Sequence, residues 1–287
     1  MHDQAERLRN RMNGHVEENN CKTIAVISGK GGVGKSTTVL NFAIEMQNKG
    51  KRVLIFDLDI GMGNIDILLG QPSKYTILNF LEEFLPIHDM IETGPKGLSY
   101  IAGGSGFNDL LELDEAKLNY FFSQYELLTK DYDYIFFDLG AGVSKSSLAF
   151  ILASDECFLV TTPEPTSIAD AYSMIKHIVK SDPQLPIVVW MNRSETVREG
   201  ELMLDKFANV AKEFLNKDII KLGVLPYDPI VTRAVSRQTP YVILKENASV
   251  SKAMRQNVER YLSLNETNYE AEQTTFIQRL KKFLLVR

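Results

Sequence analysis

Residues 27–38 read ISGKGGVGKSTT, and this stretch decides the fold that we expect. Its core, residues 29–36, satisfies G-x-x-x-x-G-K-[ST]; a β-branched run precedes it and a segment of helical spacing follows. Glycines let backbone N–H groups approach phosphate oxygens, and the following helix directs its positive end to the same place. In such a loop Lys35 reaches the β- and γ-phosphates, and the Ser36 hydroxyl can bind Mg²⁺. The stretch therefore predicts a phosphate-binding loop between a strand and a helix.

Short apolar runs alternate with segments of helical length along most of the chain. The apolar runs lie at 23–28, 52–58, 132–139, 157–162, 186–192 and 219–225, with a further candidate strand at 98–104. The helical segments include 36–49, 114–129, 166–180 and 199–216. Continuous rather than alternating hydrophobicity is typical of strands buried on both faces of a parallel sheet. The pattern predicts a doubly wound α/β fold with a mostly parallel sheet and helices on both faces.

The two ends of the chain differ in character from this central part. Residues 1–12 have helical spacing and are followed by a polar linker, so we expect residues 1–21 to form a helical extension. The central domain is expected over 22–263, and residues 264–287 form a second linker and a terminal helix.

Composition limits the functions that are plausible. The formal net charge of −5 argues against sequence-independent nucleic-acid binding as the main activity. Cys21 and Cys157 are far apart, which makes a disulfide framework improbable and a reducing cytosol the default. No apolar run approaches the roughly 20 residues of a membrane-spanning helix. We therefore expect a cytoplasmic protein that meets a membrane only at its surface.

Three carboxylates come at the ends of apolar runs. Asp57 and Asp59 end one run, and their two-residue spacing places them on the same side of an extended chain. Gly61 and Gly63 follow, which favours a mobile segment suited to sensing a nucleotide. Asp138 ends the run YIFF, an arrangement in which a buried strand brings a carboxylate close to a metal ion. A plain strand-end cap is the alternative role for Asp57.

The heptapeptide KGGVGKS at 30–36 resembles the deviant Walker A ATPases of the MinD/ParA type, which share K-G-G-x-G-K-[ST]. The resemblance implies a homodimer with two ATP molecules at its interface, in which Lys30 crosses to the ATP of the partner subunit. It also implies that Asp59 orients the attacking water and that Asp57 lies near the metal. We accordingly expect a slow, Mg²⁺-dependent ATPase.

The resemblance implies three overlapping sets of site residues. The catalytic residues are Lys30, Lys35 and Asp59. The metal site comprises Ser36, Asp57 and Asp138. The nucleotide contacts are Gly29, Lys30, Gly31, Gly32, Val33, Gly34, Lys35, Ser36, Thr37, Asn192, Pro226 and Asp228. The last three would form the adenine pocket, although Asn and Pro-Asp are common at strand ends in any case.

The C-terminal stretch TTFIQRLKKFLLVR, residues 274–287, has an apolar stripe at helical spacing, several cations and no acid. A basic amphipathic helix of this kind predicts binding to an anionic membrane surface, reversible and on the inner face of the cell membrane. The membrane-binding residues would be Phe276, Ile277, Leu280, Lys281, Lys282, Phe283 and Leu284. The alternative is a final helix packed on the protein core.

The N-terminal motif DQAERLR at 3–9, ahead of such a domain, resembles the FlhG branch of the family, whose members regulate flagellar number and placement. In that branch the segment stimulates the FlhF GTPase, so the resemblance implies FlhF and flagellar basal-body (C-ring) proteins as partners. The FlhF contacts would be Asp3, Gln4, Arg7 and Arg9.

Other classes of function stay open at this point. A ParA-type DNA-partition ATPase would need a basic surface, and a division-site ATPase of the MinD type shares the same loop. Electron transfer, as in nitrogenase iron proteins, would need paired interface cysteines, which Cys21 and Cys157 do not suggest. A scaffold that binds ATP without hydrolysing it is disfavoured by the presence of Asp59 and Asp138.

Overall fold

The computed structural model describes residues 21–59, 65–103, 114–266 and 275–285. The N-terminal motif, with Asp3, Gln4, Arg7 and Arg9, lies outside the described residues, as do Gly61 and Gly63.

The described strands form one eight-stranded sheet of order β3-β4-β2-β5-β1-β6-β7-β8. Their bounds are β1 Lys22–Ile27, β2 Val53–Leu58, β3 Glu92–Thr93, β4 Ser99–Ile101, β5 Tyr134–Leu139, β6 Glu156–Thr161, β7 Ile187–Ser194 and β8 Ile220–Pro226. All neighbours pair in parallel except β3, which is antiparallel to β4. The predicted mostly parallel sheet is confirmed, and β3 is an additional edge strand of two residues that no sequence pattern predicted.

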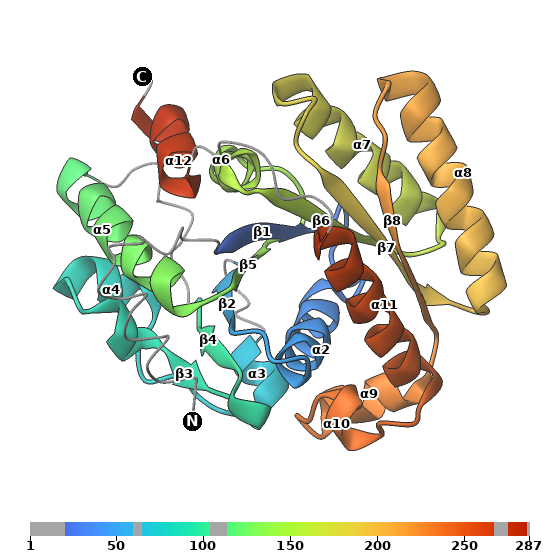
Figure 1. Ribbon diagram of the computed structural model, residues 1–287, viewed down its shortest axis with the longest axis horizontal. Coiled ribbons are helices and arrows are strands. Elements are labelled where there is room, and N and C mark those ends of the chain that lie inside the picture. Colours follow the sequence, from blue (N-terminus) through green and yellow to red (C-terminus); the bar gives the residue numbers. More distant parts are fainter. Residues whose placement is uncertain (1–20, 60–64, 104–113, 267–274, 286–287) are drawn as a thin grey trace, which may run out of the picture.

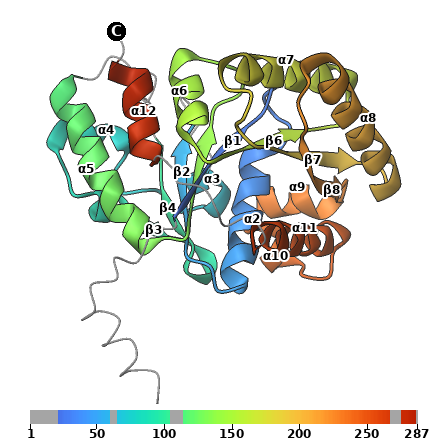
Figure 2. The same ribbon diagram turned by 45° about the horizontal axis from the view of Figure 1, so that its top comes forward.

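Helices cover both faces of this sheet (Figures 1 and 2). Their bounds are α2 Lys35–Asn48, α3 Ile65–Leu69, α4 Ile77–Glu83, α5 Glu115–Asp131, α6 Lys145–Ala153, α7 Pro165–Ser181, α8 Val197–Leu215, α9 Pro229–Ser236, α10 Tyr241–Leu244, α11 Ser249–Glu266 and α12 Phe276–Leu285, with 3₁₀ turns η1 Ile87–Met90 and η2 Pro95–Gly97. The end of α11 at Glu266 lies beyond the expected domain boundary at 263.

The strands are continuously apolar because each one serves two cores. In β1, Ala25 and Ile27 belong to the core beneath α4–α8 and α12, whereas Ile24 and Val26 belong to the core beneath α2, α3 and α9–α11. Alternate side chains point to opposite faces, so a strand covered by helices on both sides must be apolar throughout. The doubly wound arrangement follows directly from this pattern.

β1 occupies the centre of the sheet, between β5 and β6. The chain leaves β1 toward β2 on one side and later fills the other side with β6, β7 and β8, so the direction of winding reverses at this strand. The crevice at the carboxyl ends of strands around such a reversal is the usual ligand site of an open α/β sheet. The loop that follows β1 is the predicted phosphate-binding loop.

The terminal helix α12 packs on the protein core, which is the alternative that its amphipathic sequence left open; membrane binding by this helix stays a prediction. Phe276, Ile277 and Leu280 are each at most 5% exposed. The Phe276 ring lies 4.8 Å from that of Tyr125 and 5.2 Å from that of Phe137, centroid to centroid. An amphipathic stripe looks the same in sequence whether its partner is lipid or protein, so the pattern alone did not identify the partner.

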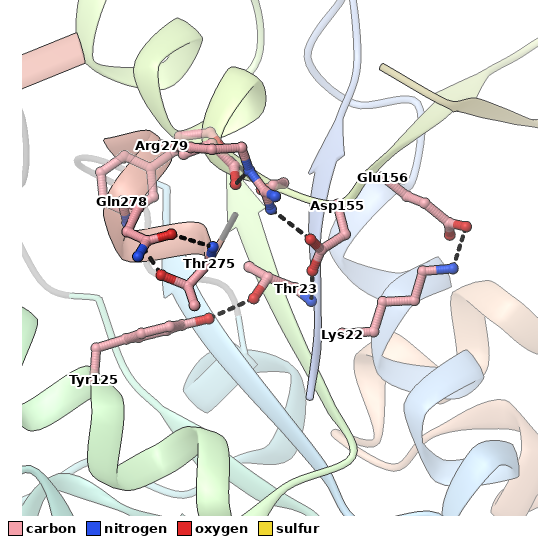
Figure 3. Close-up of polar contacts among 11 residues, drawn as sticks. Lys22, Thr23, Tyr125, Asp155, Glu156, Thr275, Gln278 and Arg279 are labelled. Atoms are coloured by element: carbon pink, nitrogen blue, oxygen red, sulfur yellow. Dashed lines mark hydrogen bonds and ion pairs between the residues drawn. The ribbon is translucent and has the colours of Figure 1, made fainter. Parts of the chain in front are cut away.

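Polar contacts fasten the same helix at its start (Figure 3). Thr275 caps α12: its hydroxyl accepts from the Gln278 N–H, and the Gln278 side chain accepts from the Thr275 N–H. The Arg279 guanidinium donates to the Ala153 carbonyl at 2.7 Å and pairs with the carboxylate of Asp155. The docked position of α12 is therefore held by apolar burial and by a partly buried ion pair.

Candidate nucleotide-binding site

The phosphate-binding loop connects β1 to α2 with the backbone that the glycine pattern requires. Gly32 and Gly34 have φ values of 79° and 92°, the left-handed region that favours glycine. A Cβ on Gly34 would lie 2.6 Å from the side-chain nitrogen of Asn192, and one on Gly29 would lie 2.3 Å from the backbone of Asp170. The glycines thus allow the loop to pack between α7 and the end of β7.

The N-terminus of α2 points into this loop. The helix has no acidic residue in its first turn, and no side chain accepts a hydrogen bond there as a cap. Its positive end and its first N–H groups are therefore suited to an anionic ligand such as a phosphate group. Ser36 and Thr37, the expected metal and nucleotide residues, lie in this first turn.

Lys35 lies between two carboxylates. Its Nζ is 2.5 Å from Oδ1 of Asp138 and 3.6 Å from Oδ2 of Asp59, and its side chain is only 6% exposed. A buried ammonium needs such partners, and a triphosphate would offer it equivalent negative charge. The structure thus brings together, at the ends of β2, β5 and the loop, three residues that the sequence assigned to one site.

Asp138 also has a carboxylate oxygen that suits a hydrated metal. The residue is fully buried, and its Oδ2 has no hydrogen-bond partner among the described residues. A buried carboxylate oxygen without a donor is costly, and a metal-bound water would satisfy it. No group of three or more His, Cys, Asp or Glu side chains that could hold a metal by itself occurs in the described part of the chain. The residues present therefore fit a Mg²⁺ ion that obtains most of its ligands from phosphate, hydroxyl and water.

Asp57 anchors the segment that follows β2 through hydrogen bonds to its backbone. Its two carboxylate oxygens accept hydrogen bonds from the backbone N–H groups of Asp59, at 3.0 Å, and of Ile65, at 3.1 Å. These contacts favour the anchoring role that a strand-end aspartate commonly has, and they fix the position of Asp59. A contact of Asp57 with the metal stays a prediction.

Asp59 lines a cavity of about 200 Å³ between the ends of β2 and β5 and the start of α6. Gly140, Gly142 and Ser147 are among the other residues that line it. Burial raises the pKa of Asp59; the Lys35 ammonium opposes this rise, and the Asp138 carboxylate adds to it. The cavity is large enough for several water molecules, so Asp59 lies where it can contact water next to the phosphate loop.

Lys30 points away from its own loop toward the segment between β6 and α7. Its Nζ lies 3.6 Å from a carboxylate oxygen of Glu164 and donates to the Thr166 hydroxyl at 3.3 Å. Sequence reasoning missed both partners. The segment TTPEPT at 161–166 continues from the end of β6 and so reaches the same edge of the sheet, which indicates proximity to the loop but no particular ion pair.

The expected adenine residues lie at the carboxyl ends of β7 and β8. The Asn192 side chain donates to the Val33 carbonyl at 2.8 Å and accepts from the Arg193 N–H, so it contacts the phosphate loop directly. Pro226 ends β8, opposite Ser194 of β7. Reading of the base by Asn192 and Pro226 stays a prediction.

Asp228, the third expected adenine residue, begins α9 as its N-cap. Its carboxylate accepts from the Ile230 N–H and the Ser249 hydroxyl. Burial alone would raise its pKa, but these hydrogen bonds outweigh burial and hold the pKa below its usual value. The contacts favour a capping role for this residue.

Comparison with known proteins agrees with this geometry. The model of the CobQ/CobB/MinD/ParA nucleotide-binding domain matches residues 24–241. The chain is 32% identical to the antiactivator FleN of Pseudomonas aeruginosa, over 76% of this chain and 78% of FleN. It is 32% identical to the flagellum site-determining protein YlxH of Helicobacter pylori, over 99% of this chain and 100% of YlxH. Among solved structures, MinD of Pyrococcus horikoshii complexed with Mg-ADP is 25% identical with a TM-score of 0.69, over 85% of this chain and 97% of that chain.

Proposed function

The chain belongs to the MinD/ParA family of nucleotide-binding proteins, and on that premise we propose that it is a Mg²⁺-dependent ATPase that acts as a dimerising switch. The observation that carries the proposal is the position of Lys35 between Asp138 and Asp59, at the start of α2 and beside the Asp59 cavity. The phosphates of ATP would replace the two carboxylates as partners of Lys35. The freed Asp59 could then contact water.

Hydrolysis is proposed to depend on positioning and charge. A water oxygen, oriented by Asp59, attacks the γ-phosphorus; the bond to the β–γ bridging oxygen breaks, and ADP and phosphate leave. Lys35 stabilises the charge that develops on the phosphate oxygens. When bound, Mg²⁺, held by the Ser36 hydroxyl and by water on Asp138, would supply further neutralisation of that charge.

Dimerisation is proposed to use Lys30. In the structure Lys30 is 45% exposed and its ion-pair partner Glu164 is 66% exposed, so the pair is held weakly. Because this ion pair within the subunit is weak, the Lys30 ammonium is available to the phosphates of an ATP molecule bound by a second copy of the chain. ATP would thus join two subunits, and hydrolysis would separate them.

Membrane residence is proposed to follow from release of α12. In the docked state its apolar stripe is covered, with Phe276, Ile277 and Leu280 buried, whereas Phe283 is 41% exposed. Burial of three such side chains contributes roughly 5–9 kcal/mol when complete, which must be exchanged for comparable burial in lipid. Two helices on one dimer would bind more strongly through effective concentration. Among the described helices, none has the length and hydropathy needed to cross a bilayer.

The role in the cell that we propose is control of flagellum number and placement, with basal-body (C-ring) proteins as partners. The support is the likeness to a flagellum site-determining protein over almost the whole chain. The N-terminal motif would stimulate the FlhF GTPase. A Gln4→Ala variant should retain its own ATPase and stimulate FlhF less; unchanged stimulation would refute this part.

The ATPase proposal is tested by a phosphate-release assay with Mg²⁺. We expect slow release from the wild-type protein and none above background from Asp59→Ala, although that variant should still bind ATP. Equal release from both proteins, or none from either under dimer-forming concentrations, contradicts the proposal.

A further inference from the structure

One flank of α5 and the segment that follows α4 expose large apolar side chains beside carboxylates. Phe84, directly after α4, is 46% exposed, and Leu127 of α5 is 38% exposed. Asp89 and Asp131 are exposed in the same region. We call the surface formed by Phe84, Asp89, Leu127 and Asp131 the α4/α5 face. Neither the nucleotide site nor the packing of α12 uses it.

Contacts along α5 bring these residues into one surface. Four residues of α5 are spaced i, i+4, i+7 and i+11 and therefore lie along one line of the helix, namely Tyr120, Gln124, Leu127 and Asp131. The Tyr120 ring lies 5.1 Å from the Phe84 ring, and the His88 ring nitrogen lies 2.8 Å from the Asp131 carboxylate. Leu127 lies between these two contacts on the same line. The two helices lie side by side in both views (Figures 1 and 2), and the line is about 16 Å long.

Phe84 has an unfavourable backbone conformation as well as an exposed ring. It ends α4 at φ 50° and ψ 45°, the left-handed region in which glycine is the usual residue and a bulky side chain is an outlier. The Tyr120 hydroxyl lies 2.7 Å from the carbonyl oxygens of both Phe84 and Leu85, and so supports this conformation. An exposed aromatic side chain held at such a position favours a role in contact with another segment.

The charges around the two apolar side chains are mostly negative. Asp89 and the two glutamates at 82–83 take part in none of the ion pairs between described residues. The ion-pair partner of Asp131 is His88, which is charged only when it is protonated. Lys74 contributes one cation near Asp89. Four carboxylates therefore leave the surface with an excess of negative charge, which complements a basic segment.

The N-terminal part of the chain enters the fold next to this surface. Cys21 is the first residue that the structure describes. The N–H of Lys22 donates to the Asp133 carbonyl at 2.9 Å, and Asp133 comes two residues after Asp131, the last residue of α5. Residues 1–20 are therefore attached to the fold at the Asp131 end of the α4/α5 face.

That N-terminal part contains a short basic segment with apolar side chains. Residues 7–12 read RLRNRM, with three arginines and no acid. Leu8 and Met12 are four residues apart, which places them on one side of a helix. The eight residues 13–20 join this segment to Cys21 and can span at most roughly 29 Å. The segment can therefore reach the whole length of the α4/α5 face.

We propose that residues 7–12 dock on the α4/α5 face of their own chain. The apolar side chains of the segment cover Phe84 and Leu127, and its arginines pair with Asp89 and Asp131. A few such anchors bind weakly between separate molecules. A short tether supplies an effective concentration on the order of millimolar, so weak contacts are sufficient within one chain.

Docking has a consequence for the N-terminal motif at residues 3–9, because the two segments overlap at residues 7–9. The motif would be partly covered while the segment is docked, and a binding partner would have to displace it. This consequence rests on the proposed stimulation of FlhF, whereas the docking itself does not.

Limited trypsin digestion of the full-length chain with ADP tests the docking. Trypsin cleaves after arginine, and the rate of cleavage after Arg9 and Arg11 is measured by mass spectrometry against that of a synthetic peptide of residues 1–20. The test variants are Phe84→Ser and Asp89→Asn/Asp131→Asn.

Matched control variants make the same substitutions on α8 and beyond it. Phe214→Ser removes an aromatic side chain that is 67% exposed, and Asp205→Asn/Asp218→Asn removes two exposed carboxylates. The melting temperature of every variant verifies that the fold is intact.

We expect cleavage of the wild-type chain to be at least roughly tenfold slower than cleavage of the peptide, because proteolysis follows the undocked fraction. Each test variant should raise the rate at least roughly fivefold, and each control should leave it within about twofold. The proposal is overturned if the wild-type chain is cleaved as fast as the peptide, or if the test variants are cleaved no faster than the controls. Protection that is lost on dilution of the chain also overturns it, because a second copy would then hold the segment. The assay contains no GTPase, so a failure of FlhF stimulation leaves its result unchanged.

Discussion

Substitution of Asp155 by Asn should release α12 without changing α12 itself. The Asp155 carboxylate pairs with Arg279 of α12 and accepts from the Thr23 N–H. An asparagine oxygen can still accept from Thr23, so the substitution removes mainly the charge. The two side chains are 11% and 23% exposed, and a charge-assisted hydrogen bond in such a place contributes about 1–2 kcal/mol. Loss of that amount raises the equilibrium constant for undocking of α12 by a factor of roughly 5–30.

The assay is co-sedimentation with phosphatidylglycerol vesicles in the presence of ADP, where the proposed cycle keeps α12 docked. Asp155→Asn should bind more vesicles than the wild type, and removal of residues 275–287 should abolish the gain. Asp205→Asn is the matched control, since it removes the charge of an exposed ion pair with Lys221 elsewhere on the surface. If Asp155→Asn and wild type sediment equally, or if the truncated form still gains, the docked helix does not control lipid binding.

Three further predictions concern the site and its supports. Lys35→Met leaves the buried Asp138 carboxylate without its cation and should lower the free energy of unfolding, measured by urea denaturation, by about 3–5 kcal/mol. Adding Asp138→Asn to this variant should recover most of the lost stability. No recovery in the double variant would contradict the pairing. Gly34→Ala places a Cβ 2.6 Å from the Asn192 side chain at a φ of 92° and should lower the melting temperature by several degrees. Gly31→Ala is the control, because a Cβ there has nothing within 4 Å and should leave the melting temperature unchanged. Equal effects of the two substitutions would count against the loop geometry. Asp228→Ala removes the cap of α9 and should cost about 1 kcal/mol at pH 7. Because the pKa of Asp228 is depressed in the folded state, this difference should be fully present above the ordinary aspartate pKa of about 4 and should fade as the pH falls through the depressed value. A difference that does not decrease as the pH is lowered would exclude the carboxylate as its source.

The sequence was sufficient for the central fold because local pattern and tertiary environment agree there. Each of the six apolar runs is a strand within two residues at either end, and 98–104 contains β4. The loop at 29–36 fixes where β1 ends and α2 begins, and that junction places Lys35. Asp59 and Asp138 then meet Lys35 because parallel strands bring their carboxyl ends to one edge of the sheet.

The contacts that the sequence did not predict join residues far apart in the chain. Lys30 and Glu164 are separated by 134 positions, and no local pattern indicates that they pair. The amphipathic pattern of α12 does not say whether its apolar side chains contact protein or lipid. The structure shows that they contact the protein core, where Leu280 is fully buried. The anchoring contacts of Asp57 and the cap formed by Asp228 are likewise hydrogen bonds to backbone groups, which residue type alone does not reveal.

Mass determination by light scattering tests the central claim most directly. The Asp59→Ala protein, which we expect to bind ATP without hydrolysing it, should have the 32.4 kDa mass of one chain with ADP and about twice that mass with ATP. Adding Lys30→Ala should return the ATP-bound protein to the mass of one chain, with ATP binding itself preserved. A mass of one chain for Asp59→Ala with saturating ATP at high protein concentration would contradict the account.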